Sequence, residues 1–327
     1  MRSVVIGELG GPEVLRLENR PLPVPGRGDI RVRVRGAGVN RADLLQRRGL
    51  YPAPPGWPRD IPGLEYAGEV ESAGPDVTQW RPGDRVMGLV GGGGYAEYVV
   101  VPARVAVAVP DGMPVDEAAA VPEAFITAHD ALFARLGLVL GERLLVHAVG
   151  SGVGTAALQI AKAAGATVLG TSRSAWKLDR ARELGLDVAI DASGGDFAEA
   201  VRHATNGAGA DAVLDLVGGS YVAGSLECLA TQGRMAVVGL TGGRSAQVDL
   251  GTVLGKRLTI VGTSLRTRPL EERIQAARAF DRGVVPLLAD GRARPILDRV
   301  LGFDQAAEAH RRMESNANFG KIVLAWP

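Results

Sequence analysis

The chain has 327 residues, of which 46% are hydrophobic and 22% are charged, and its formal net charge is +1. This length and composition predict a globular protein of about two domains. The balanced charge gives no reason to expect nucleic acid or an anionic membrane as a partner. The single cysteine, Cys228, excludes an internal disulfide and a cysteine-based metal centre, and it favours a cytoplasmic location. We expect no signal peptide, because the N-terminal segment lacks an apolar core and a cleavage site.

Residues 1–122 predict a domain of short antiparallel strands. The segment Asp29–Gly36 alternates apolar and charged side chains, which is the pattern of a half-buried strand. Tyr66–Ala73 and Asp84–Leu89 resemble it, and a further strand, Tyr95–Val101, is expected after the four-glycine loop Gly91–Gly94. Proline and glycine separate these runs, most densely in Tyr51–Pro62.

Residues 123–266 alternate apolar strands with helical patterns, which predicts an α/β domain with a doubly wound parallel sheet. The expected strands are Leu144–His147, Thr167–Gly170, Val188–Asp191, Ala212–Leu216, Met235–Gly239 and Leu258–Val261. The expected helices are Thr155–Ala164, Ala175–Leu184, Phe197–Thr205 and Ser220–Leu229. After residue 266 the pattern predicts a helix over Leu270–Leu288 and a final strand, Lys321–Ala325, that returns to the first domain.

A glycine turn links the strand beginning at Leu144 to the helix beginning at Thr155. Its residues Gly150, Ser151, Gly152 and Val153 precede the helix, where free N–H groups and the positive end of the helix dipole favour a pyrophosphate. We therefore predict that they bind a dinucleotide. The turn departs from a strict G-x-G-x-x-G fingerprint, and an ordinary strand–helix connection is the alternative.

The end of the next strand predicts which dinucleotide is bound. An acid about 20 residues after the glycine turn is typical of proteins that prefer NAD. Here that place is held by Ser172, followed by Arg173 and Lys177, and a hydroxyl with two cations favours the 2′-phosphate of NADPH. The alternative is a solvated helix start capped by Ser174.

Two further turns are expected to approach the nicotinamide half of the cofactor. Gly218 follows one predicted strand, and Gly239 and Leu240 follow another. Because glycine has no side chain, the backbone at these turns can approach the ligand closely. Simple termination of the strands is the alternative interpretation.

Several motifs occur in one frame: GVNRADLLQRRGLY (38–51), IPGLEYAGEV (61–70), PGDRVMGL (82–89), HAVGSGVGTAALQIAKAAGA (147–166) and NFGKIVL (318–324). Together they resemble the zinc-free quinone oxidoreductase (zeta-crystallin-like) branch of the medium-chain dehydrogenase/reductase superfamily, in its p53-inducible type. The resemblance implies a GroES-like domain over residues 1–122, completed by 267–327, and a Rossmann NADPH-binding domain over 123–266. It also implies a homodimer, for which the edge strand Leu258–Val261 is the expected contact.

The zinc ligands of related alcohol dehydrogenases are missing. The matching positions hold Asn40, Leu64 and Glu123, and the leucine cannot bind a metal. Without a Lewis acid, hydride transfer favours an acceptor that delocalises its own negative charge. We therefore expect a metal-free NADPH:quinone oxidoreductase. A 2-alkenal or enone reductase with the same cofactor is the alternative, and a non-enzymatic NADPH- or RNA-binding protein is a third interpretation that the balanced charge disfavours.

Three hydrogen-bond donors are candidate catalytic residues. Tyr51 is the expected donor to the new oxyanion, with a packing role as the alternative. Asn40 is expected to assist it, with a turn-forming role as the alternative, and Ser151 is expected to contact the pyrophosphate or the nicotinamide side. The resemblance adds Thr127, Leu265 and Asn318 as residues near the nicotinamide.

Other polar residues are interpreted as structural. Asp43, Arg47 and Glu65 are expected to form ion pairs in loops of the first domain, and His147 is expected to be a buried core histidine.

Overall fold

The structure is a computed structural model that describes residues 1–326, and the chain forms two compact units. Unit 1 contains residues 1–126, 265–289 and those from 295 onward, whereas unit 2 contains residues 127–264 and 290–294. The predicted combination of an antiparallel β domain with a doubly wound α/β domain is confirmed.

Unit 1 is built on a mainly antiparallel sheet of seven strands with the order β14-β15-β3-β4-β5-β7, in which β6 also pairs with β3. The strands are β3 (Asp29–Val39), β4 (Glu65–Ala73), β5 (Arg85–Leu89), β6 (Tyr98–Pro102), β7 (Val107–Ala108), β14 (Leu297–Gly302) and β15 (Lys321–Ala325). The last strand runs antiparallel to β3, with Ile322 opposite Val39. The alternation in β3 buries Ile30, Val32 and Val34 in the core.

The first strands of unit 1 and its strand β6 differ from the sequence prediction. A hairpin of β1 (Arg2–Ile6) and β2 (Leu15–Asn19) was not expected. The predicted strand Tyr95–Val101 begins only at Tyr98, because Ala96 forms an isolated bridge to Ser3 instead of joining β3.

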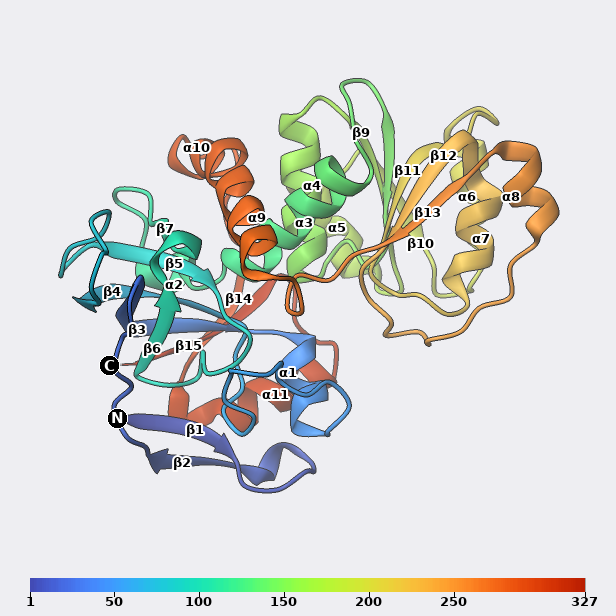
Figure 1. Ribbon diagram of the computed structural model, residues 1–327. Helices are drawn as coiled ribbons and strands as arrows, with labels where there is room; N and C mark the ends of the chain where they lie inside the picture. The colour runs from blue at the N-terminus through green and yellow to red at the C-terminus, as the bar shows by residue number, and fades with distance from the viewer. Residues whose placement is uncertain (327) are drawn as a thin grey trace. The chain divides into compact units, whose positions relative to one another are not determined.

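The helices of unit 1 are α1 (Arg41–Arg47), α2 (Val115–Ala118), α9 (Leu270–Gly283), α10 (Val285–Ala289) and α11 (Ala306–Glu314). Short 3-10 segments cover Pro12–Val14, Ala103–Val105 and Phe303–Gln305. The helix predicted over Leu270–Leu288 is interrupted at Val284, because Pro286 has no amide hydrogen for the helical ladder. Helices α1 and α11 lie side by side (Figure 1).

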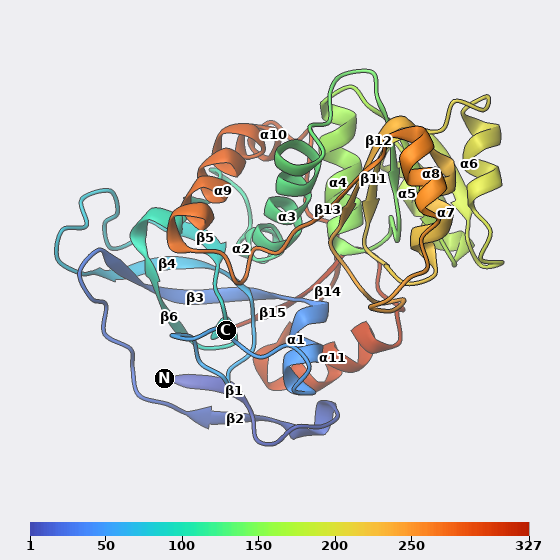
Figure 2. The ribbon, with the colours of Figure 1, turned by 45° about the vertical axis from the view of Figure 1, so that its right-hand side comes forward.

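Unit 2 contains a parallel sheet of six strands with the order β10-β9-β8-β11-β12-β13. These strands are β8 (Arg143–Val146), β9 (Thr167–Ser172), β10 (Val188–Asp191), β11 (Ala210–Asp215), β12 (Leu229–Val237) and β13 (Thr259–Gly262). Helix α4 (Gly152–Ala163) covers one face of the sheet, and α6 (Ala198–Ala204), α7 (Tyr221–Cys228) and α8 (Leu250–Lys256) lie together on the other (Figures 1 and 2). The remaining helix of the doubly wound pattern is α5 (Ala175–Glu183), which packs on β9 and β10.

A π-helical stretch marks the end of unit 1 and the start of unit 2. Residues Pro122–Ile126 and Asp130–Arg135 adopt π-helical turns on either side of α3 (Thr127–His129). Single π turns are rare in proteins, and those that do occur are often found at functional sites. Within residues 1–326, no helix is long and apolar enough to cross a membrane.

Candidate functional site

The glycine turn of unit 2 is shaped as an anion cradle. Ser151 caps α4 by accepting a hydrogen bond from the Gly154 N–H at 3.1 Å. A Cβ atom on Gly154 would lie only 2.5 Å from the carbonyl oxygen of Ala148, so only glycine fits there. Ala148 itself has a φ of +50°, a strained value that a functional turn can retain. The first amides of α4, at Gly152 and Val153, thus lie at a helix N-terminus suited to phosphate.

The Ser151 hydroxyl caps the start of its own helix, a role that the sequence did not predict. Its oxygen accepts the Gly154 N–H of the same turn, because an N-cap side chain satisfies the unpaired donors of a helix start. The remaining hydroxyl hydrogen is the part of Ser151 available to a phosphate or substrate oxygen.

The residues predicted to select the cofactor lie together at the end of β9. Ser172 is buried at the last position of that strand and accepts a hydrogen bond from the Ser174 N–H at 3.1 Å. Arg173 is exposed, and the Lys177 ammonium lies 5.3 Å from the centroid of the Trp176 ring. The nearest acid in strand register is Asp191 on β10, whose carboxylate accepts the Ser193 N–H.

The two other predicted turns of unit 2 contact each other. Gly218 forms an isolated parallel bridge with Gly243, and a Cβ atom on it would lie 3.0 Å from a side-chain carbon of Leu240. A Cβ atom on Gly239 would lie 2.4 Å from the Leu216 carbonyl oxygen. These contacts place Gly218, Gly239 and Leu240 in one cluster beyond the carboxyl ends of the strands, where open α/β sheets bind ligands.

Asp215 supports that cluster and has one unsatisfied atom. Its Oδ1 accepts the N–H groups of Val217 and Gly218 at 2.8 and 2.9 Å. Its Oδ2 is buried and has no partner among the described residues, and burial raises the pKa of this carboxyl. A buried Asp215 Oδ2 without a partner among the described residues, beside the two turns, is suited to bond to a hydroxyl group of a bound dinucleotide.

Two further polar residues of unit 2 are buried. Thr127 opens α3 and is 8% exposed. His147 lies 2.9 Å from both the Thr171 and the Ser225 hydroxyl oxygens, and burial lowers its pKa to about 3. The interpretation of His147 as a satisfied core histidine is therefore confirmed.

A buried ion pair organises the candidate site of unit 1. The Lys321 ammonium on β15 lies 2.6 Å from Glu65 Oε1 on β4, and the two side chains are 5% and 0% exposed. The same ammonium donates to the Asn40 Oδ1 at 2.6 Å and to the Val39 carbonyl at 3.2 Å. The Asn40 amide in turn donates to Glu65 Oε1 at 2.8 Å and to the Gly38 carbonyl at 3.2 Å.

This arrangement limits what Asn40 can do. An amide group has two donor hydrogens, and both are used within the protein. As the residues are placed, Asn40 has no N–H left for a substrate oxygen, so its part is to position Glu65 and Lys321. The expected ion-pair role of Glu65 is confirmed, but Glu65 lies on a central strand and not in a loop.

A second buried network joins α1 to α11. Asp43 accepts the backbone N–H groups of Asn40 and Gly63 and the Tyr95 hydroxyl, and burial raises its pKa to about 6. The Tyr95 oxygen lies 3.3 Å from His310, which lies 3.1 Å from the Arg47 guanidinium.

The ion pairing of this network differs from the expectation. Arg47 pairs with Glu314 on α11, whereas Asp43 is held by neutral donors. Both Asp43 and Arg47 lie on a helix, because Asn40 begins α1 with a capping box in which Asp43 is the third residue.

The segment that contains Tyr51 is fixed by Arg266, a residue that the sequence analysis did not single out. The Arg266 guanidinium donates to the carbonyl oxygens of Tyr51 and Gly91, both at 2.9 Å, and to the Gln46 side chain. It also lies over the Tyr51 ring, 4.8 Å from the centroid. The Tyr51 hydroxyl has no partner among the described residues, and the ring is half-buried. The packing role is therefore present, and the phenol is still available as a donor.

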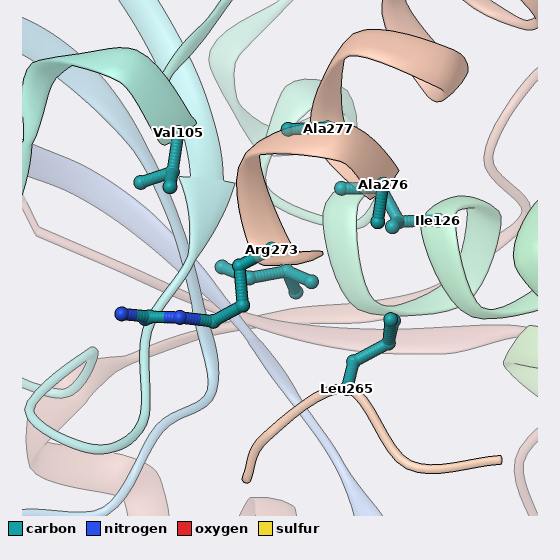
Figure 3. Close-up of a pocket in the computed structure, with 7 residues that line it drawn as sticks. Val105, Ile126, Leu265, Arg273, Ala276 and Ala277 are labelled. Atoms are coloured by element: carbon teal, nitrogen blue, oxygen red, sulfur yellow. The ribbon is translucent and has the colours of Figure 1, made fainter. Parts of the chain in front are cut away.

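The remaining predicted residues of unit 1 have defined surroundings. Asn318 is buried and donates to the Gly320 carbonyl at 3.0 Å. Leu265 lines a small apolar hollow together with residues of α9 and the π turn (Figure 3). The side chains around it are Leu89, Val105, Ile126, Arg273, Ala276 and Ala277.

Two of the three positions that match zinc ligands, Leu64 and Asn40, have other surroundings in this structure. Leu64 is a buried core residue, 2% exposed. The Asn40 Oδ1 accepts a hydrogen bond from the Lys321 ammonium, which also bonds to Oε1 of the neighbouring Glu65. Among residues 1–326, no group of three or more His, Cys, Asp or Glu side chains is placed to hold a metal ion.

Two family models match the chain. The alcohol dehydrogenase GroES-like domain matches residues 26–111, and the zinc-binding dehydrogenase model matches residues 152–281.

Among curated relatives, the synaptic vesicle membrane protein VAT-1 homolog of Rattus norvegicus is 33% identical over 99% of this chain and 84% of its own length. A quinone oxidoreductase of Pseudomonas aeruginosa is 40% identical over 63% of each chain. The pikromycin polyketide synthase component PikAII of Streptomyces venezuelae is 45% identical over 56% of this chain, but this match spans only 5% of that relative's length.

Solved structures resemble the whole chain. A Pseudomonas syringae quinone oxidoreductase has a TM-score of 0.90 at 30% identity, with 99% of both chains covered. The mycobacterial protein Rv1454c, complexed with NADPH, has a TM-score of 0.87 at 30% identity and full coverage of both chains. An NAD-dependent alcohol dehydrogenase (0.88, 33% identity, both chains fully covered) and the CurK enoyl reductase (0.87, 27% identity, 100% of this chain and 99% of that one) are also similar. With both domain models matched and relatives aligned along nearly its whole length, the chain belongs to the medium-chain dehydrogenase/reductase superfamily of nicotinamide-dependent oxidoreductases.

Proposed function

We propose that the protein transfers hydride from NADPH directly to quinones, without a metal ion. The observation that carries this proposal is the Lys321 ammonium, which donates hydrogen bonds to Asn40 Oδ1 and Glu65 Oε1, while the neighbouring Leu64 is buried and cannot bind a metal. A fixed ammonium cannot act as a Lewis acid on a substrate carbonyl, because it has no coordination position to exchange. The acceptor must then delocalise its own negative charge, as a quinone does.

NADPH is the proposed cofactor because of the groups at the end of β9. Ser172, Arg173 and Lys177 offer a hydroxyl and two cations, whereas an acid at this place would repel a 2′-phosphate. Within unit 2, the N-terminal amides of α4 would hold the pyrophosphate, and Gly218, Gly239 and Leu240 would face the nicotinamide half. The bound cofactor supplies the hydride. The NADPH complex of Rv1454c is consistent with this choice.

Tyr51 is the proposed hydrogen-bond donor to the oxyanion that forms on the acceptor. Its hydroxyl is unpaired, and Arg266 holds both its carbonyl group and its ring, so the donor is positioned before substrate arrives. Thr127, Leu265 and Asn318 are proposed to contact the cofactor. The Ser151 hydroxyl is proposed to interact with the phosphate or the substrate, and Asn40 to hold Glu65 and Lys321 in place.

Reduction of 2-alkenals or enones is a second candidate activity. The similarity to the CurK enoyl reductase favours it, and conjugated carbonyl compounds also delocalise the charge that hydride transfer creates. The experiment compares the rate of NADPH oxidation with a benzoquinone and with a 2-alkenal, for the parent protein and for Tyr51→Phe. The proposal expects the quinone to be the faster acceptor and Tyr51→Phe to lower turnover about tenfold to a thousandfold with unchanged NADPH affinity. A faster 2-alkenal would favour the second candidate, and no NADPH oxidation with either acceptor would refute both.

A homodimer is proposed as the working form. Strand β13 is at the edge of the parallel sheet, and Ile260 on it is 44% exposed. An exposed apolar edge strand pairs readily with another strand, and an antiparallel copy of β13 would satisfy both edges.

A further inference from the structure

Glu123 is joined to the Lys321 network through its backbone, whereas its side-chain carboxyl has no bonded partner among the described residues. It lies in the π turn Pro122–Ile126, and its backbone N–H donates to Glu65 Oε2 at 2.8 Å. Its side-chain carboxyl is half-buried and makes no hydrogen bond or ion pair with any described residue. The Glu65 carboxylate, in contrast, accepts from Asn40, from Lys321 and from the Glu123 backbone.

The charges around Glu123 favour its neutral form. The Lys321 ammonium is bonded to Glu65, so a second negative charge in the same region would lack a bonded partner. Burial and the negative charges of Glu65 and Asp43 together raise the pKa of Glu123 to about 8, against the opposing effects of Lys321 and Arg266. A half-buried carboxylic acid that keeps its proton at neutral pH is suited to general-acid catalysis.

We propose that Glu123 is the general acid of the site and gives its carboxyl proton to the oxyanion formed on the reduced acceptor. The inference rests on the proposed function. Hydride transfer oxidises the nicotinamide and reduces the quinone to a hydroquinone monoanion. The O–H bond of Glu123 then breaks, a new O–H bond forms on the hydroquinone, and the carboxylate regains a proton from water. Tyr51 has the separate task of hydrogen-bonding the oxyanion.

The first test compares pH–rate profiles of quinone reduction for the parent, Glu123→Gln and Glu123→Asp. Because the acid must be protonated, the parent rate is expected to fall as pH rises through about 8. Glu123→Gln is expected to lower kcat by roughly 100-fold and to lose this fall, since glutamine has no proton to give. Glu123→Asp restores an acid and is expected to restore the pH dependence. Glu117→Gln, on α2 in the same unit, is the matched control and is expected to behave as the parent does.

The second test does not depend on turnover. Infrared difference spectra, recorded while pH is raised through 8, are expected to show a protonated-carboxyl band that disappears in the parent and in Glu117→Gln and is absent from Glu123→Gln. A folded Glu123→Gln variant with the parent's pH profile and infrared band would overturn the inference while leaving the proposed function intact. A parent that shows the band but does not oxidise NADPH with a quinone would refute the proposed function instead.

Discussion

Replacement of Lys321 by methionine tests how the core of the candidate site is held together. Lys321→Met keeps the length and apolar stem of the side chain but removes the ammonium from Glu65, Asn40 and the Val39 carbonyl. Glu65 is then a fully buried carboxylate without a counter-ion. Loss of one partner of a buried pair costs about 3–5 kcal/mol, and the side-chain exposures of 5% and 0% place this pair in that class.

The assay is urea unfolding followed by tryptophan fluorescence, because Trp57, Trp80 and Trp326 all belong to unit 1. The double variant Lys321→Met/Glu65→Gln removes the unpaired charge, and it is expected to be more stable than Lys321→Met alone by at least about 1 kcal/mol. Arg104→Met is the matched control, because its ion pair with Glu271 is exposed (56% and 64%) and contributes about 0–1 kcal/mol. A loss below about 1 kcal/mol for Lys321→Met, or a double variant less stable than the single one, would refute the reasoning.

Three further predictions concern the cofactor, the assembly and pH. Ser172→Asp combined with Lys177→Ala is expected to invert the ratio of kcat/KM for NADPH and NADH, and equal use of both cofactors by the parent would count against the assignment. Light scattering at micromolar concentration is expected to give a dimer mass for the parent and a monomer mass for Ile260→Lys; a monomeric parent would contradict the proposed β13 contact. Because the pKa of Glu123 is raised in the folded protein from 4.5 to about 8, its stabilising effect is present in full below pH 4.5 and is lost as pH rises to about 8. Urea unfolding should therefore show the parent losing stability relative to Glu123→Gln across that window, and a constant difference would contradict the shift.

The sequence predicted the fold well where its hydrophobic pattern was strong. Most strands and helices of unit 2 follow the predicted alternation, because a buried parallel strand and an amphipathic helix have different periods. Helix α8 was not predicted, and β12 begins at Leu229 and not at Met235. Helix α1 was missed because only one of its four buried residues, Leu44, is apolar, while Asp43, Gln46 and Arg47 are polar or charged. The break at Val284 depended on Pro286, a local signal that the helical period concealed.

The candidate site was predictable as a set of residues but not as a set of bonds. Asn40 was identified, but its amide donates to the nearby Gly38 carbonyl and to Glu65. Glu65 lies on β4, and only the fold brings that strand next to Asn40. Lys321 lies in the motif NFGK, yet its partner Glu65 is distant in the sequence and the pair depends on the return of β15 to β3. Arg266 carried no signal at all, since its bonds are to two carbonyl groups and one side-chain amide that lie in two distant segments of the chain.

The most direct test of the central claim is the stoichiometry of quinone reduction by the metal-free protein. The protein is dialysed against a strong chelator, its metal content is measured, and NADPH oxidation is followed with a benzoquinone under anaerobic conditions. The account predicts one hydroquinone formed for each NADPH consumed, at the same rate before and after chelation. Activity that is lost on chelation and restored by Zn²⁺, or NADPH that is not consumed with a quinone, would contradict it.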